Sequence, residues 1–120
     1  MFYAEKNNGS FLNNRRIRVS KKKDLNECLF ATNGEKFKHA DLSSRKTGCA
    51  ALDMAYVANG RFDGYFQDKL NLWDVAAGII LIKESGGIIN SIDLNKKENL
   101  EILASSSIIS EKMHEKLGKF

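Results

Sequence analysis

LWDVAAGIILIKESGG, Leu72–Gly87, is the most informative segment of this 120-residue chain. It contains the only tryptophan, Trp73, beside a carboxylate, Asp74, and no charged residue occurs from Val75 to Ile82. A helix that is apolar almost all the way round is typical of a buried position. Gly86-Gly87 supplies the residue type that commonly ends a helix. We therefore predict a buried helix, with Trp73 and Val75–Ile82 at the centre of the core.

Asp74 has two interpretations at this stage. A carboxylate in the first turn of a helix interacts favourably with the helix dipole, and acidic first turns are common. The same position would also let the carboxylate bind a metal ion or a hydroxyl group beyond the helix end. The small residues Ala76-Ala77-Gly78 leave one side of the helix thin enough for another backbone or a ligand to approach.

Length and composition indicate one globular domain, because 42% of the residues are hydrophobic and 28% are charged. The longest apolar run, Val75–Ile82, is far too short to cross a bilayer. The first ten residues lack the basic-then-apolar order of a secretory signal. We therefore expect a cytoplasmic protein that does not contact a membrane.

The net charge is +4, and basic residues cluster at Arg15–Arg18 and Lys21–Lys23. A nucleic-acid surface is one interpretation of such clusters. However, no aromatic residues are interleaved with these charges, as they are in many single-strand binders. We favour a solvated strand and turn, and do not expect a nucleic-acid partner.

The two cysteines, Cys28 and Cys49, have no close-spaced cysteine or histidine. This spacing predicts reduced, packed thiols rather than a zinc site or a disulfide framework. His39 and His114 lie in polar segments and are predicted to be surface residues.

Local patterns predict alternating strands and helices along the chain. Ala50–Ala58 carries an apolar stripe at spacings of three and four, which is typical of a helix, and Asn59-Gly60 ends it. Other predicted elements are a hairpin over residues 2–19, strands at 28–31, 62–67, 88–89 and 102–104, a polar loop at 33–44, and a helix at 111–119 with Met113 and Leu117 facing inward. This order predicts an α/β fold with a layered sheet flanked by helices.

Three blocks of the chain resemble the C-terminal half of the inositol monophosphatase family. They are GSFLNNRRIRVS at Gly9–Ser20, RKTGCAALDMAYVANGRFDGYF at Arg45–Phe66, and Leu72–Gly87 itself. The resemblance implies that residues 1–120 form a single domain like the C-terminal domain of that fold. It also implies a Mg²⁺-dependent phosphatase acting on inositol monophosphate or a related sugar phosphate.

The resemblance assigns site residues position by position. Asp74 matches an aspartate that binds a catalytic metal ion. Gly48, Cys49 and Ala50 match the start of a helix that lines the substrate, and Gln67 falls where many members place an acidic residue that binds a substrate hydroxyl. Mg²⁺ prefers oxygen ligands, and in this family several metal ions activate a water for attack on phosphorus.

Departures from the family pattern are as informative as the match. The chain has no proline, so it lacks the family's metal-binding loop Asp-Pro-Ile-Asp-Gly-Thr, and the segment from Thr32 to Arg45 is shorter than usual. Cys49 stands where serine or threonine is usual. Asp53 does not fall on a ligand position and is expected to face solvent.

Two functions of different class remain open. The chain is either the C-terminal part of a phosphatase that is inactive without an N-terminal metal-binding half, or a non-catalytic remnant or interaction module that keeps the fold. In both cases we expect exposed apolar surface, covered in a homo-oligomer or by a complementary half.

Overall fold

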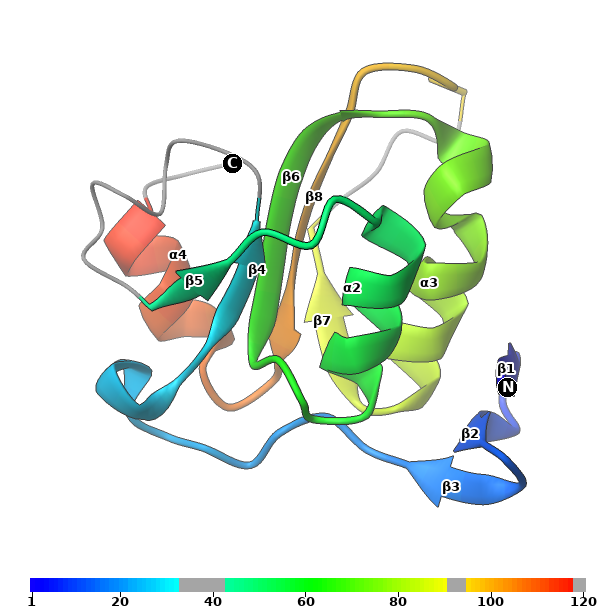
Figure 1. Cartoon of the computed structure of the whole chain (residues 1–120), viewed down its shortest axis with the longest axis horizontal. Helices are drawn as coiled ribbons and strands as arrows, with labels where there is room; N and C mark the ends of the chain where they lie inside the picture. Colours follow the sequence, from blue (N-terminus) through cyan, green and yellow to red (C-terminus); the bar gives the residue numbers. More distant parts are fainter. Residues whose placement is uncertain (33–42, 91–94, 118–120) are drawn as a thin grey trace.

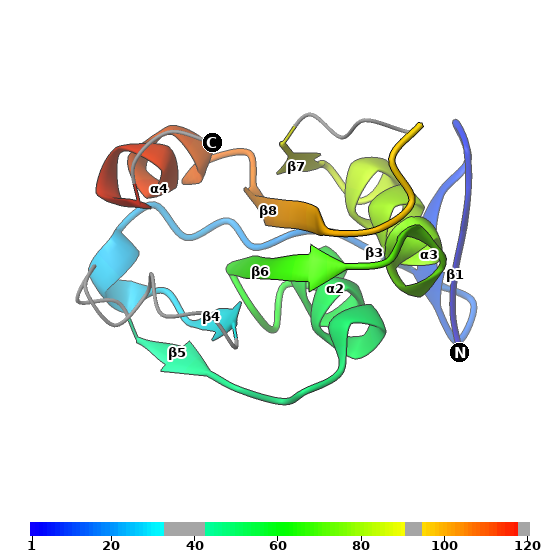
Figure 2. The ribbon, with the colours of Figure 1, turned by 90° about the horizontal axis from the view of Figure 1, so that it is seen from above.

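The computed structural model describes residues 1–32, 43–90 and 95–117. Its elements form layers (Figures 1 and 2). A five-stranded mixed sheet, in the order β5-β4-β6-β8-β7, has α4 on one face and α2 and α3 on the other. A three-stranded antiparallel sheet, β1-β2-β3, lies on the far side of α3. The predicted layered α/β arrangement is confirmed.

The five-stranded sheet combines both strand directions. Its strands are β4 (Phe30–Thr32), β5 (Ser44–Arg45), β6 (Gly64–Leu70), β7 (Gly87–Ile89) and β8 (Leu100–Ser106). Strand β4 runs parallel to β5 and β6, whereas β8 runs antiparallel to β6 and β7. The two faces of this sheet carry separate apolar clusters, one beneath α2 and α3 and one beneath α4 (Ser110–Leu117).

Helices α2 (Ala50–Ala58) and α3 (Leu72–Glu84) pack side by side. Gly78 makes this close approach possible, because a Cβ built there would lie 2.8 Å from Met54. Of the predicted thin side, Ala76-Ala77-Gly78, only Gly78 is therefore used for helix packing, and Ala76 and Ala77 are exposed. On α3, Val75, Leu81 and Ile82 are buried on the same side.

Trp73 does not lie at the centre of the core, and that prediction is wrong. Its side chain is 66% exposed, and Ile80 on the same helix is 42% exposed. The reason is that α3 is apolar on two faces, and the described chain covers only one of them fully. The largest fully buried side chains instead include Tyr65, Phe30 and Met54.

The predicted hairpin is confirmed as β1 (Phe2–Glu5) and β2 (Gly9–Leu12), followed by β3 (Arg15–Ile17). Asparagines at positive φ occupy its turns, Asn7 at 69° and Asn14 at 69°, as asparagine tolerates this conformation well. The Ser10 hydroxyl donates a hydrogen bond to the Leu81 carbonyl at 2.6 Å, which joins the small sheet to α3.

Other boundaries shift by a few residues. The short 3-10 helix η1 (Leu25–Glu27) was not predicted, and Ser44 belongs to β5 rather than to the predicted polar loop. Residues 33–42 of that loop, including His39, and the side chain of Leu117 lie outside the described residues. Met113 is buried as predicted. No helix in the described ranges is long and apolar enough to cross a membrane.

Candidate functional site

One pocket of about 370 Å³ is lined by all five residues that the sequence singled out. Gly48 and Cys49 precede α2, Ala50 begins it, Gln67 comes from β6, and Asp74 lies in the first turn of α3. Three segments distant in sequence thus meet at one end of the α2–α3 pair. Ala51, Lys69 and Leu70 complete the lining.

The loop before α2 leaves the start of that helix open to the pocket. Gly48 has φ +81°, a conformation that favours glycine, although nothing lies within 4 Å of a Cβ built there. Cys49 is exposed rather than packed as predicted, and its side chain makes no capping hydrogen bond. The first N–H groups of a helix lack partners within the helix, and such an end is well suited to an anion.

Asp53 is buried, with 2% of its surface exposed, so the expectation that it faces solvent is wrong. It lies on the inner side of α2, where the Thr47 hydroxyl donates a hydrogen bond to it. Burial raises the pKa of Asp53, and the bond from Thr47 opposes that rise. Thr47 also accepts the Cys49 N–H at 3.3 Å, so Asp53 fixes the loop that forms one pocket wall.

Gln67 already has a partner for its amide oxygen. The Tyr65 hydroxyl donates to Gln67 Oε1 at 2.6 Å, and burial raises the pKa of Tyr65, which keeps this hydroxyl protonated. The amide nitrogen of Gln67 is left to offer donors to a ligand. A carboxylate at the same position could only accept hydrogen bonds.

Asp74 and Lys69 give the pocket one charge of each sign. Asp74 is exposed, and its Oδ2 accepts a hydrogen bond from the Asn71 side-chain amide at 3.4 Å. Lys69 has φ 56°, at an irregularity of the β6–β8 pairing between Gln67 and Leu70. Sequence reasoning missed Lys69, because only the strand register reveals this irregularity.

The described residues do not by themselves fit a magnesium site. Among them, no group of three or more His, Cys, Asp or Glu side chains is placed to hold a metal ion. Asp74 can therefore supply one carboxylate. Mg²⁺ demands near-octahedral oxygen coordination and needs further ligands.

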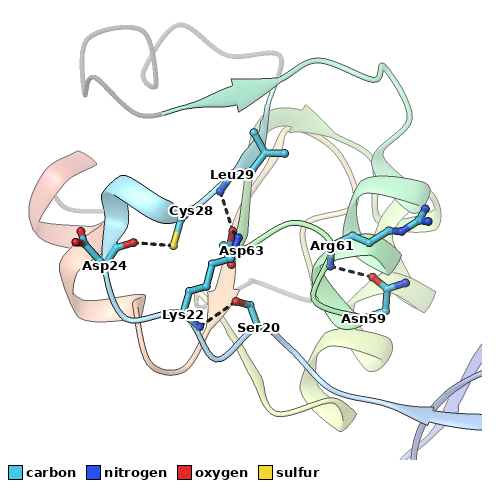
Figure 3. A network of polar contacts seen from close by, with 8 residues as sticks. All are labelled: Ser20, Lys22, Asp24, Cys28, Leu29, Asn59, Arg61 and Asp63. Carbon is cyan, nitrogen blue, oxygen red and sulfur yellow. Dashed lines mark hydrogen bonds and ion pairs between the residues drawn. The ribbon is translucent and has the colours of Figure 1, made fainter.

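A second polar cluster, around Asp63, is structural (Figure 3). Asp63 is fully buried directly before β6, and its Oδ2 accepts the Leu29 N–H at 2.7 Å. Lys22 pairs with the same oxygen at 3.4 Å, and the Cys28 thiol donates to the Asp24 carbonyl at 3.3 Å. These contacts hold the segment after β3 against the sheet next to the first residue of β6, whereas the pocket is lined by residues at the other end of that strand.

Comparisons with known proteins agree with this fold. The model of the inositol monophosphatase family matches residues 1–119. The inositol-1-monophosphatase of Caulobacter vibrioides is 37% identical over 98% of this chain and 53% of its own length. Nus factor SuhB of Xylella fastidiosa is 40% identical over 74% of this chain and 38% of its own length.

A solved structure, that of the extragenic suppressor protein suhB from Bartonella henselae, has a TM-score of 0.86 at 36% identity. It is matched over 98% of this chain and 52% of its own length. The chain belongs to the inositol monophosphatase family. It spans about half the length of the relatives it matches.

Proposed function

We propose that residues 1–120 form the C-terminal domain of a Mg²⁺-dependent phosphatase for inositol monophosphate or a related sugar phosphate, active only with a complementary half. The convergence of Gly48, Cys49, Ala50, Gln67 and Asp74 on one pocket carries this proposal. Membership of the family supports the reaction class.

Each pocket residue has a task in this proposal. The open start of α2 and the Lys69 ammonium bind the phosphate group. The Gln67 amide donates to a substrate hydroxyl. Asp74 supplies one metal ligand, and the remaining ligands come from the complementary half. Both cysteines are free thiols, which supports a reducing, cytoplasmic location.

The experiment is co-expression of this chain with the part of the Caulobacter vibrioides relative that it does not match. Phosphate release from inositol monophosphate is then measured with and without Mg²⁺. We expect no phosphate release above background from the chain alone, and Mg²⁺-dependent phosphate release from the mixture of the two co-expressed parts. Asp74→Asn should abolish that release, whereas Asp68→Asn, a nearby carboxylate outside the pocket lining, should retain it. Turnover by the chain alone that Asp74→Asn removes would contradict the requirement for a second half.

A non-catalytic interaction module is the second candidate. It is favoured by relatives that carry the name Nus factor SuhB and by the exposed apolar side chains of α3. On this alternative the mixture forms a complex that releases no phosphate, and Asp74→Asn changes nothing measurable.

A further inference from the structure

Lys69 has a left-handed backbone conformation in which the described part of the chain otherwise places only asparagine and glycine. Its φ is 56°. The other described residues at positive φ that are not glycine are Asn7, Asn13, Asn14 and Asn99. Asparagine tolerates this conformation, whereas the longer side chain of lysine has no local hydrogen bond that favours it. Strained positions of this kind gather at binding sites, where the side chain performs a task.

An irregularity of β6 brings Lys69 to the same pocket wall as Gln67. Tyr65 packs in the apolar cluster beneath α2 and α3, and Gln67 points to the same side because side chains alternate along a strand. The regular pairing of β6 with β8 is interrupted between Gln67 and Leu70. Such irregularities redirect side chains beside functional sites, and here Lys69 and Leu70 both line the pocket.

This wall of the pocket offers hydrogen-bond donors. The Tyr65 hydroxyl donates to Gln67 Oε1 at 2.6 Å, which leaves the amide nitrogen of Gln67 with its two N–H groups. The Lys69 ammonium has three N–H donors and no acceptor. Among the described residues, Lys69 makes no ion pair. A ligand group that binds both side chains therefore has to accept hydrogen bonds and has no need to donate one.

Charge favours an anionic group as that acceptor. Asp74 is the one carboxylate among the described residues that line the pocket, and the proposed function assigns it to a metal ion. The ammonium of Lys69 then leaves this wall with an unbalanced positive charge. Hydrogen bonds between a charged donor and a charged acceptor are about twice as strong as those between neutral groups. A charged acceptor is therefore a better partner for this wall than a hydroxyl group.

A carboxylate fits this wall better than a second phosphate group does. One ammonium balances the single charge of a carboxylate, whereas a phosphate monoester carries about 1.5 to 2 negative charges at neutral pH. No second lysine or arginine lies among the described residues of the lining. The two oxygens of one carboxylate can accept from the Gln67 amide and from the Lys69 ammonium, one each.

We propose that Gln67 and Lys69 form a carboxylate subsite, so that the pocket selects a sugar phosphate that also carries a carboxylate group. The inference rests on the proposed function and narrows its substrate class to phosphorylated sugar acids, with the carboxylate in place of the hydroxyl at Gln67. Lys69 uses its three donors for the carboxylate and for an oxygen of the phosphate group. The reaction is unchanged: a water oxygen bonds to phosphorus, the ester P–O bond breaks, and the sugar oxygen leaves with a proton from the water.

The subsite is tested with glucuronate 1-phosphate, glucose 1-phosphate and glucose 1,6-bisphosphate. These ligands share one ring and differ only at the exocyclic carbon, which is a carboxylate, a hydroxymethyl group or a phosphorylated hydroxymethyl group. Isothermal titration calorimetry measures their affinity for the chain, and the NMR shift of the Gln67 side-chain amide shows where they bind. We expect glucuronate 1-phosphate to bind about tenfold more tightly than glucose 1-phosphate, or better, as for a hydrogen bond between charged groups.

Lys69→Asn is the matched variant, because asparagine occupies the other described left-handed positions that are not glycine. It should reduce the preference for glucuronate 1-phosphate to about twofold or less. Gln67→Glu repels the carboxylate of the ligand and accepts from a hydroxyl, so it should reverse the preference. Lys21→Asn makes the same charge change at an exposed residue outside the described pocket lining, and should leave the preference unchanged. Circular dichroism establishes that each variant folds.

Equal affinity for glucuronate 1-phosphate and glucose 1-phosphate overturns the inference, as does a preference that survives both pocket variants. The absence of saturable binding of glucuronate 1-phosphate also overturns it. Tighter binding of glucose 1,6-bisphosphate than of glucuronate 1-phosphate overturns it in favour of a subsite for a second phosphate group.

The mixture with the unmatched part of the Caulobacter vibrioides relative separates this inference from the proposed function. There we expect kcat/KM for glucuronate 1-phosphate to exceed that for glucose 1-phosphate about tenfold, mainly through KM. Preferential binding of glucuronate 1-phosphate without phosphate release from any of the three ligands overturns only the proposed function. Mg²⁺-dependent release with equal kcat/KM for the two monophosphates overturns only the carboxylate subsite.

Discussion

The sulfur atoms of Cys28 and Cys49 have opposite environments. Cys28 is buried, and burial together with the nearby Asp63 carboxylate raises its pKa to about 11. Cys49 is exposed at the mouth of the pocket. Since the thiolate is the reactive form, we expect iodoacetamide at pH 8 to modify Cys49 and to spare Cys28, as read by peptide mass spectrometry. Both should react in guanidinium, and equal rates in the folded chain would show that Cys28 is not enclosed.

Ile82 and Ile80 lie on different faces of α3, one buried and one exposed. Ile82 is fully buried, and a Cβ built at Gly87 would lie 2.6 Å from its Cγ2, so the packing there is tight. Ile82→Ala should lower the free energy of unfolding by about 2–5 kcal/mol. Ile80→Ala, on the exposed face, should change it by about 0.5 kcal/mol or less. Urea unfolding measures both, and similar losses would mean that the two faces are equally packed.

At the scale of elements, Glu84 fastens the β1–β2 turn to the end of α3. Backbone N–H groups of Asn7 and Gly9 point to its carboxylate and lower its pKa, with a smaller contribution from Arg16. A lowered folded-state pKa contributes stability at neutral pH, which is lost as the pH falls from the ordinary glutamate range toward the lowered value. We therefore expect the protection of the β1 and β2 amides, measured relative to the intrinsic exchange rate at each pH, to decrease below that range.

Glu84→Gln should weaken the same protection at neutral pH and remove its dependence on acid. Hydrogen exchange followed by mass spectrometry at several pH values measures this, with Glu111→Gln on α4 as the control. An unchanged acid dependence in Glu84→Gln would show that another carboxylate anchors the turn.

Element positions were predictable where a local pattern ends in a clear signal. The helix Ala50–Ala58 was predicted with its observed bounds, because its apolar stripe stops at Asn59-Gly60. Strand β5 was missed, since its two residues carry no periodicity and depend on pairing with β4. The left-handed Lys69 was missed for the same reason: a register irregularity belongs to a strand pair, not to one strand.

Whether a helical side chain is buried or exposed was less predictable than the position of its helix. The helix that contains Trp73 was predicted, but its apolar composition alone does not determine whether one or both of its faces pack against other elements. Asp53 shows the converse, because a carboxylate on an inner helix face becomes acceptable when Thr47 supplies a hydrogen bond. The pocket residues came from the resemblance, and the structure adds that the Gln67 amide oxygen already accepts a hydrogen bond from the Tyr65 hydroxyl.

At the scale of the molecule, the exposed apolar side chains of Trp73 and Ile80 on α3 limit the stability of the chain on its own. Buried apolar area is the main favourable term in folding, and here Trp73 and Ile80 contribute little of theirs. A partner that binds only the folded chain stabilises it by mass action. At a free partner concentration about 100 times the Kd, the gain is about 2.7 kcal/mol.

We therefore expect the melting temperature of the chain to be higher in the complex than for the chain alone. In domains of up to about 100 residues, each kcal/mol of stabilisation raises the melting temperature by about 4–8 °C, and this is an upper limit for a longer chain. Melting followed by isotope-edited infrared spectroscopy of the labelled chain separates its unfolding from that of the partner.

Mg²⁺ alone should leave the melting temperature unchanged, because Asp74 is a single exposed carboxylate and cannot replace the hydration shell of the ion. Ile80→Glu should lose the gain while melting like the wild-type chain when alone, since Ile80 lies outside the packed face. A rise that Ile80→Glu retains would place the stabilising contact elsewhere on the molecule, and a rise with Mg²⁺ alone would mean that the chain assembles more of a metal site than Asp74 provides.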